Sequence, residues 1–474
     1  MTFCFDNQFL QRFPDLAHTQ HPAGFTKAQA VILNTGLRDE LSLPYTDQQL
    51  TAIAAGQQLD PAMAPLAQKY TGHQFGHYNP YLGDGRGLLL GEWQTGSGRF
   101  DLHLKGAGPT PFSRGHDGRA VLRSSIREYL AGEALFALGI PTTRALAVTR
   151  GDLTVYREQP EQGAMLLRVA GTHIRFGHFE YCYHRGKAGD LKELVNYVID
   201  TQWPDLKNLP LAEFFQRVVE RTAKMIALWQ VYGFNHGVMN TDNMSIIGET
   251  FDFGPYAMLD RYQPEFICNH SDTTGRYRFS EQPSVGLWNL NCLAQALSPI
   301  IESEQLVASL HTYTKVLQEH YWEKMTGRLG LSDSVMGRDI VRRWLKLLDE
   351  SGQDYNLSFR RLITALRDSP ETLPANLKTN ANFSLWLRDY LNLLETEASD
   401  KAQLLAQMES VNPLYILRNY LAQQAISAAE DNDFKPLQRL AEVLRKPFSE
   451  QDHAEAYVAE PPDWGRHLQI SCSS

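Results

Sequence analysis

The hydrophobic pattern of the chain changes from strand-like to helical near its middle, and this change limits the folds that it can adopt. In the first half, apolar runs are short and separated by many glycines. Residues 100–105 alternate between apolar and polar side chains with the two-residue period of a strand. After about residue 287, apolar residues recur every three or four positions, as on helices that bury one face. The sequence therefore predicts an α+β fold, with a small β-rich part followed by a larger helical part.

Short apolar runs in the first half predict three strands, at residues 88–93, 100–105 and 164–169. A hairpin is expected over 145–157, with its turn at Gly151 and Asp152. A helix is expected from about Val121 to Leu138, where a glycine and a proline follow. Residues 1–65 are expected to form an irregular segment with short helices, since Asn34–Leu50 is rich in turn formers and polar groups.

The overall charge limits the partners of the chain. Lys and Arg number 45 against 54 Asp and Glu, a formal net charge of −9. Such a charge repels polyphosphate backbones at long range, so we expect no nucleic-acid partner, and any phosphate ligand needs a local cluster of cations. The 5 cysteines include no C-x-x-C pair, which argues against a disulfide framework or a zinc ribbon. Without a basic apolar leader or an apolar stretch of about 18 residues, we expect a cytoplasmic protein with no membrane partner.

The segment from His236 to Gly254 carries the strongest chemical signal. It reads H-G-V-M-N-T-D-N-M-S-I-I-G-E-T-F-D-F-G and follows an expected amphipathic helix over Phe214–Tyr232. A polar loop, a short apolar strand over Met244–Ile247 and a turn come before the D-F-G. Each piece alone is a weak signal, but the order of helix, polar loop, strand and D-F-G is typical of a metal-phosphate site.

Two residues of this segment match the metal ligands of protein kinases. Those enzymes hold two Mg²⁺ ions with an Asn of the catalytic loop and the Asp of the D-F-G. Asn243 and Asp252 have the same types and the same order. Because Mg²⁺ prefers oxygen ligands and adds substrate phosphates, we predict a Mg²⁺ site here, with Mn²⁺ as the alternative metal.

Upstream residues fit the same arrangement. A kinase strand Lys touches the nucleotide phosphates and pairs with a Glu of the next helix. Lys105 lies on the polar face of the strand 100–105, and Glu128 is central in the helix that follows. In G-D-G-R-G at 83–87, closely spaced glycines let backbone N–H groups approach an anion, and Arg86 adds a cation.

The catalytic loop departs from the kinase pattern at the base. In H-R-D-x-x-x-x-N the Asp accepts the proton of the substrate hydroxyl. The corresponding position is Val238, which cannot accept a proton. Asp242, beside Asn243, is the nearest carboxylate that could serve instead.

Two arginines form a second departure. Arg168 lies near the end of the strand that would line the adenine pocket of a kinase, and Arg175 follows. Guanidinium groups suit phosphate oxygens, although surface ion pairs are the simpler interpretation for either one alone. If these arginines bind phosphates, the nucleotide lies in the reverse of its orientation in a protein kinase, with its γ-phosphate deep in the site and its α-phosphate near the metal. The group transferred would then be AMP and not phosphate.

Four long motifs together closely resemble the selenoprotein O family of YdiU-like proteins: Y-T-G-H-Q-F-G-H-Y-N-P-Y-L-G-D-G-R (70–86), L-K-G-A-G-P-T-P-F-S-R-G-H-D-G-R (104–119), F-N-H-G-V-M-N-T-D-N-M-S (234–245) and D-F-G-P-Y (252–256). The resemblance implies a protein-kinase-like two-lobed pseudokinase fold with a long helical C-terminal extension. It also implies a protein adenylyltransferase that moves AMP from ATP to Ser, Thr or Tyr hydroxyls of proteins.

The resemblance also implies roles for individual residues. Asp242 would be the proton acceptor, and Asn243 and Asp252 would bind Mg²⁺. Glu128 would support the lysine of the ATP site, whose implied lining is Gly83, Gly85, Arg86, Lys105, Asp117, Gly118, Arg168 and Arg175. Eukaryotic family members carry selenocysteine near the C-terminus, where this chain has Cys472, so a redox switch through a disulfide with Cys268 is a further expectation.

The motifs divide the expected fold into four segments, namely an N-terminal segment (1–65), a β-rich nucleotide-binding lobe (66–170), a catalytic lobe with the metal site (171–290) and a helical C-terminal region (291–474). Two other functions remain open, an atypical phosphotransferase and a non-catalytic ATP-binding scaffold.

The segment H-Q-F-G-H at 73–77 resembles the zinc motif H-E-x-x-H, but Gln74 cannot act as a base and Gly76 would break the helix.

Overall fold

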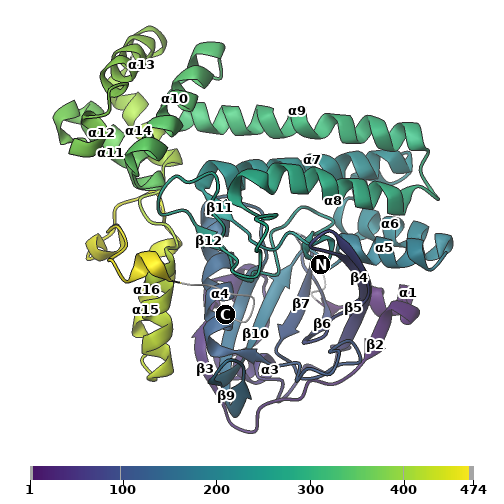
Figure 1. The fold of residues 1–474 in the computed structure, drawn as a ribbon. Helices are drawn as coiled ribbons and strands as arrows, with labels where there is room; N and C mark the ends of the chain where they lie inside the picture. The colour runs from purple at the N-terminus through teal and green to yellow at the C-terminus, as the bar shows by residue number, and fades with distance from the viewer. Residues whose placement is uncertain (1–3, 97, 399, 469–474) are drawn as a thin grey trace.

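The structure is a computed structural model that describes residues 4–96, 98–398 and 400–468. Within these residues the chain forms a ten-stranded antiparallel sheet and a larger set of helices, so the expected mixture of β-rich and helical parts is confirmed (Figure 1). The sheet contains β1 (Cys4–Phe5), β2 (Ala17–Thr19), β3 (Ala28–Leu33), β4 (Leu66–Gln74), β5 (His77–Gly83), β6 (Gly87–Gln94), β7 (Arg99–Lys105), β8 (Ala120–Val121), β9 (Arg144–Tyr156) and β10 (Pro160–Ala170). Its main path runs β2-β4-β6-β7-β10-β9-β3.

The helices come mainly after the sheet. They are α1 (Gln8–Arg12), α2 (Thr35–Glu40), α3 (Asp47–Ala54), α4 (Leu122–Ala137), α5 (Phe176–His184), α6 (Ala188–Gln202), α7 (Leu211–Tyr232), α8 (Gln282–Leu297), α9 (Ser303–Arg328), α10 (Val335–Ser351), α11 (Tyr355–Arg367), α12 (Ala375–Lys378), α13 (Phe383–Glu397), α14 (Lys401–Val411), α15 (Asn419–Glu430) and α16 (Lys435–Leu444). The expected helices at 121–138 and 214–232 correspond to α4 and α7, and the expected strands at 88–93, 100–105 and 164–169 to β6, β7 and β10.

The sheet buries both of its faces, because side chains alternate along each strand. On one face, Leu90 of β6 packs in a cluster with Ile53 of α3. The neighbouring Leu89 belongs to a larger core that contains Leu130 of α4. Helix α4 therefore covers the face opposite to α3, next to the helical half of the chain (Figure 1).

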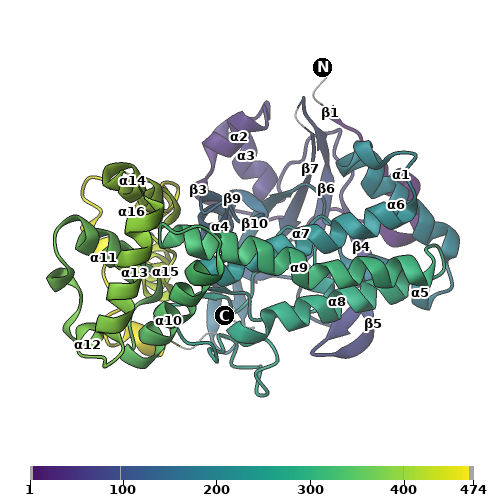
Figure 2. The ribbon, with the colours of Figure 1, turned by 90° about the horizontal axis from the view of Figure 1, so that it is seen from above.

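The helical half has two regions. Helices α7 and α9 lie side by side along much of their length, with α8 beside both (Figures 1 and 2). Helices α10–α14 gather at one end of the molecule, and α15 and α16 return to pack against α4 of the sheet region (Figure 1). The end of the helical part is thus in direct contact with the helix that covers the sheet.

The hairpin expected over 145–157 is wrong. Residues 144–156 form the single strand β9, which pairs with β10, and the turn comes after Tyr156. Gly151 lies inside this strand. The residue there is glycine because the Phe25 ring occupies the space of a side chain, so that a Cβ would lie 2.2 Å from the ring carbons. A glycine within a strand can thus mark close packing and not a turn.

Two further expectations differ from the structure. Residues 1–65 contain short helices, but they also contribute β1, β2 and β3 to the sheet. Residues 244–247 form no strand, since only Ser245 makes an isolated bridge, with Arg175. This segment turns too soon, at Gly248, to extend a ladder.

No helix of the described part is both long and apolar enough to cross a membrane. The expected cytoplasmic location stays a prediction.

Arg418 links the C-terminal helices to the centre of the molecule. Its side chain is 1% exposed and forms ion pairs with Asp260, beyond β12 (Ala257–Met258), and with Asp354, which caps α11, at 2.7 Å each. A buried ion pair that loses one partner leaves an uncompensated charge.

Arg418→Ala should therefore lower the free energy of unfolding by about 3–5 kcal/mol, because it leaves two carboxylates without their cationic partner. The matched control is Arg388→Ala, which removes the exposed pair with Asp389 and should cost about 1 kcal/mol or less. Urea unfolding followed by tryptophan fluorescence measures both variants. Equal destabilisation by the two substitutions would contradict a structural role for the buried network.

Candidate active site

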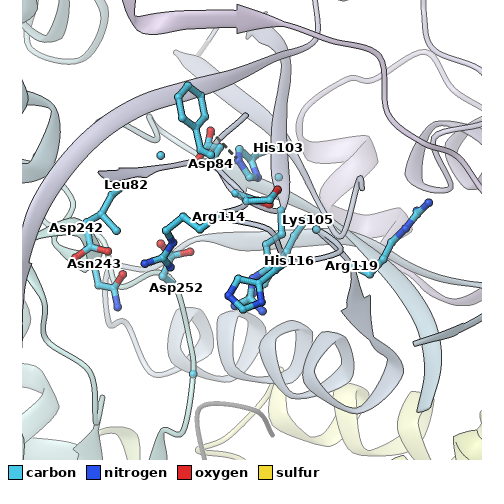
Figure 3. A pocket seen from close by; sticks show the side chains of 18 of the residues that line it. Leu82, Asp84, His103, Lys105, Arg114, His116, Arg119, Asp242, Asn243 and Asp252 are labelled. Carbon is cyan, nitrogen blue, oxygen red and sulfur yellow. Dashed lines mark hydrogen bonds and ion pairs between the residues drawn. The ribbon is translucent and has the colours of Figure 1, made fainter. Parts of the chain in front are cut away.

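A cavity of about 770 Å³ lies between the sheet and the loop that follows α7 (Figure 3). The structure places in its lining every residue that the sequence assigned to the site, except Glu128, namely Gly83, Gly85, Arg86, Lys105, Asp117, Gly118, Arg168, Arg175, Asp242, Asn243 and Asp252. Figure 3 shows Asp242 and Asn243 on one side of this cavity and Arg119 on the other. A single cavity thus contains assigned residues that range in the sequence from Gly83 to Asp252.

The buried end of the cavity is a network of charged side chains. Lys105 and Arg168 both donate to the Glu128 carboxylate. Arg168 Nη1 also lies 2.8 Å from Asp252 Oδ1, and Arg175 donates to Asp252 Oδ2. Glu128 therefore lies directly behind the cations that face the cavity.

Sheet pairing and α4 build this network. Lys105 lies opposite Leu166 in the β7–β10 ladder, and Arg168 lies opposite His103, so Lys105 and Arg168 project from the same face of neighbouring strands. Helix α4 packs across this face and brings Glu128 to both cations.

Burial and neighbouring charges shift the pKa values of these groups. Burial lowers the pKa of Lys105 to about 8, despite the opposing effect of Glu128. Burial alone would raise the pKa of Asp252, but Arg175, Arg168 and Lys105 hold it well below its usual value. Arg168 and Lys105 likewise lower the pKa of Glu128 against the opposing effect of burial, so this carboxylate stays ionised.

Two glycine-rich loops form the wall opposite this network. At Gly85 a Cβ would lie 2.8 Å from Phe112 O, and at Gly118 it would lie 2.2 Å from Gly108 O. Gly118 also has a φ of 65°, which disfavours other residues. Only glycine lets these segments pack so closely, and the packing leaves their backbone along the cavity.

The loop that carries Asn243 and Asp252 begins after β11 (Phe234–Asn235). Asn243 lies in a single 3₁₀ turn and donates from Nδ2 to Val238 O at 3.0 Å. His236 Nε2 lies 3.0 Å from Phe251 O and fixes the segment before Asp252. Asp252 has a left-handed backbone, with φ of 57°, a conformation that is uncommon outside glycine and is concentrated at functional sites.

Asp242 is buried at the side of the cavity. Its Oδ2 accepts a hydrogen bond from Gln74 Nε2 at 3.0 Å, and its Oδ1 has no partner among the described residues. Burial raises the pKa of Asp242 to about 7, against the opposing effects of Arg175 and Gln74. A carboxylate with this proton affinity suits a general base near neutral pH.

The oxygen ligands of the site fit a Mg²⁺ ion that is shared with a phosphate. Asn243 and Asp252 supply hard oxygen ligands, and each carboxylate oxygen of Asp252 keeps a lone pair beside its arginine partner. Within the described residues, no group of three or more His, Cys, Asp or Glu side chains is placed to hold a metal. The expected Mg²⁺ site stays a prediction.

Sequence reasoning missed several residues that line the cavity: Asp84, His103, Arg114, His116 and Arg119. All of them lie in or beside stretches that it had singled out, the G-D-G-R-G loop, the strand 100–105 and the segment 104–119. His103 could have been found from the strand alternation, which places it on the same face as Lys105. The loop residues had no local signal, since their direction depends on how the two glycine-rich segments pack.

Cys268 is buried, with Sγ 3.6 Å from Asn235 O and close to Gly237. Cys472 lies outside the described residues. The disulfide expected between the two therefore stays a prediction.

Comparison with known proteins places the chain in a family. Residues 1–445 match the family described as protein adenylyltransferase SelO. The chain is 48% identical to the protein nucleotidyltransferase YdiU of Stutzerimonas stutzeri, with 99% of this chain and 98% of the relative aligned. It is 49% identical to that of Vibrio cholerae (96% and 95% aligned) and 52% identical to that of Pseudomonas fluorescens (88% and 87% aligned). The chain therefore belongs to the protein adenylyltransferase SelO family.

Proposed function

We propose that this chain transfers AMP from ATP to Ser, Thr or Tyr hydroxyls of other proteins and releases pyrophosphate. The observation that carries the proposal is the cluster of Lys105, Arg168 and Arg175 around Asp252 at the buried end of the cavity. Lys and Arg side chains outnumber Asp side chains in the lining of the cavity, so an anionic ligand such as a triphosphate suits the site. Membership of an adenylyltransferase family supplies the class of reaction.

We also propose that the arrangement is kinase-like. The sheet with α4 corresponds to the first lobe, helices α5–α9 with the loop of Asn243 and Asp252 to the second, and α10–α16 to the C-terminal extension. The support is local: Lys105 of a strand pairs with Glu128 of the next helix, as in kinases.

The nucleotide is proposed to bind with its triphosphate inward. Arg168 and Arg175 are 3% and 2% exposed, so their guanidinium groups favour the charged end of the ligand at the buried end of the cavity. An adenine there would bury its ring against two charged groups. The sugar and base then lie toward the mouth, near the exposed Tyr156.

In this orientation the reaction occurs at the α-phosphorus. A new bond joins the acceptor oxygen to this phosphorus, and the bond to the β-phosphate oxygen breaks. The proton of the acceptor hydroxyl goes to Asp242, and pyrophosphate leaves along Lys105 and the arginines. Mg²⁺, or Mn²⁺ as the alternative, would be held by Asn243 and Asp252 and would neutralise charge on the phosphates.

Labelled ATP tests the proposed reaction directly. With ATP labelled at the α-phosphate, protein substrates should become labelled, and with ATP labelled at the γ-phosphate they should not. A chelator should abolish the signal, because the sparse oxygen ligands need a metal to hold the phosphates. Label from the γ-phosphate would indicate a phosphotransferase instead, and binding of ATP without transfer of either label would indicate a scaffold.

Asp242→Asn should lower kcat for AMP transfer by about 10²- to 10⁴-fold, because the amide keeps the size of the side chain but cannot accept the proton. Binding of a non-hydrolysable ATP analogue, measured by calorimetry, should stay within about threefold of the native value. Transfer at the native rate would contradict the role of Asp242 as base.

The orientation of the nucleotide can be tested with ATP that carries a bulky substituent on the adenine N6. With the base toward the mouth, the substituent projects into solvent, and the affinity should fall by less than about fivefold. With the base at the buried end, the substituent would overlap Arg168 and Arg175 and binding should be lost. Competition against unmodified ATP distinguishes these outcomes.

A further inference from the structure

The motif H-Q-F-G-H, which the proposed reaction does not use, forms the tip of the β4–β5 hairpin. Gln74 lies opposite His77, and the two-residue turn between them, Phe75-Gly76, has φ of 50° and 85°. Positive φ at both positions is typical of a tight hairpin turn, but phenylalanine is a costly residue there. The strained turn at Phe75 is held by contacts outside the hairpin.

Those contacts are with the catalytic loop. His73 N donates to Thr241 Oγ1 at 2.7 Å, and Phe75 N donates to Asn240 Oδ1 at 3.1 Å. Gly72 makes the approach possible, because a Cβ there would lie 3.0 Å from the Asp242 Cβ. The hairpin thus lies directly against the residues that surround the proposed base.

Gln74 is the one hairpin side chain that the structure shows in a hydrogen bond to Asp242. Its Nε2 donates to Asp242 Oδ2 at 3.0 Å, while its Oε1 accepts from Asn79 Nδ2 at 3.2 Å. Asn79 Oδ1 in turn accepts from Tyr81 N at 3.0 Å. Since that backbone N–H can only donate, the chain of bonds sets the direction of both amides and presents the NH₂ group of Gln74 to the carboxylate.

We propose that Gln74 is a positioning residue, which holds Oδ2 of Asp242 and so fixes the orientation in which the carboxylate meets the acceptor hydroxyl. Asp242 lines the cavity, and its Oδ1 is buried with no hydrogen-bond partner in the described part of the chain, so the bond from Gln74 is the side-chain contact that orients the carboxylate. A neutral amide suits this task, because it fixes the carboxylate without the charge of a lysine, which would weaken the base, or of a glutamate, which would repel it. The inference rests on the proposed function, in which Asp242 accepts the proton.

Gln74→Met tests the positioning role, because methionine has a similar length and shape but no N–H donor. We expect kcat for AMP transfer to fall by about 10- to 100-fold, the effect of a misplaced catalytic group, while KM for ATP changes by less than about twofold. A native kcat, or a rise in KM for ATP that matches the loss of kcat, would overturn the proposal. His77→Ala, an exposed position on the same hairpin, is the matched control and should keep native kinetics.

Asn79→Asp separates positioning from simple loss of structure. An aspartate oxygen can only accept, so the Gln74 amide should turn its NH₂ group toward residue 79 and away from Asp242. We expect a fall in kcat similar to that of Gln74→Met. The double variant should be no worse than Gln74→Met alone, since Asn79 acts through Gln74. Additive losses would overturn the proposed chain of hydrogen bonds.

Asp242→Asn, assayed in parallel, distinguishes failure of this inference from failure of the proposed function. Native transfer by Asp242→Asn contradicts the base assignment, and the positioning role falls with it. Loss of transfer by Asp242→Asn together with native kcat in Gln74→Met contradicts the positioning role alone.

Discussion

The charge balance at the buried end of the cavity is the constraint on which the rest of the structure depends. Lys105, Arg168 and Arg175 pair with Glu128 and Asp252, and all of these side chains except that of Asp252 are buried. An uncompensated charge in such surroundings costs several kcal/mol, even after relaxation. Loss of either carboxylate would therefore leave buried cations without a partner, which is why the positions of both are tightly constrained. The proposed binding of a triphosphate depends on this arrangement of charges.

Helix α4 has to hold Glu128 in place for that balance to exist, and it is fixed from two sides. Arg127 donates to Tyr256 O at 2.8 Å, and Tyr256 Oη donates to Arg127 O at 2.7 Å, which joins α4 to the segment after the D-F-G. On the other side, Arg445 at the end of α16 donates to Tyr129 Oη at 3.2 Å. Glu128 lies in sequence between Arg127 and Tyr129 and cannot shift unless both contacts change. The C-terminal helices therefore support the charge network and are not a separate appendage.

Structural features that depend on a local sequence pattern could be predicted from the sequence. Features that depend on packing between residues far apart in the chain could not. The alternation in β7 indicated the direction of Lys105, and motif order brought Asn243 and Asp252 to the same site. Gly151 was misread as a turn because its function is to admit Phe25, which lies far away in the sequence. The bond between Gln74 and Asp242 spans 168 positions, so no local pattern contained it. The H-Q-F-G-H motif that carries Gln74 resembles a zinc motif, and that likeness indicates nothing of a contact with Asp242.

The sheet gives the proposed base and the proposed phosphate cations a common frame. Gln74 ends β4, which pairs with β6, and β6 pairs with β7, which ends at Lys105. Transfer of AMP requires the acceptor oxygen, the α-phosphorus and the leaving oxygen to lie nearly in line, so an error in the position of either end reduces the rate. The hydrogen bond from Gln74 therefore links the Asp242 carboxylate to the same sheet that positions Lys105. The backbone of Asp242 belongs to the loop after α7, so the bond from Gln74 is a contact through which a strand of the sheet orients the carboxylate for the proposed reaction.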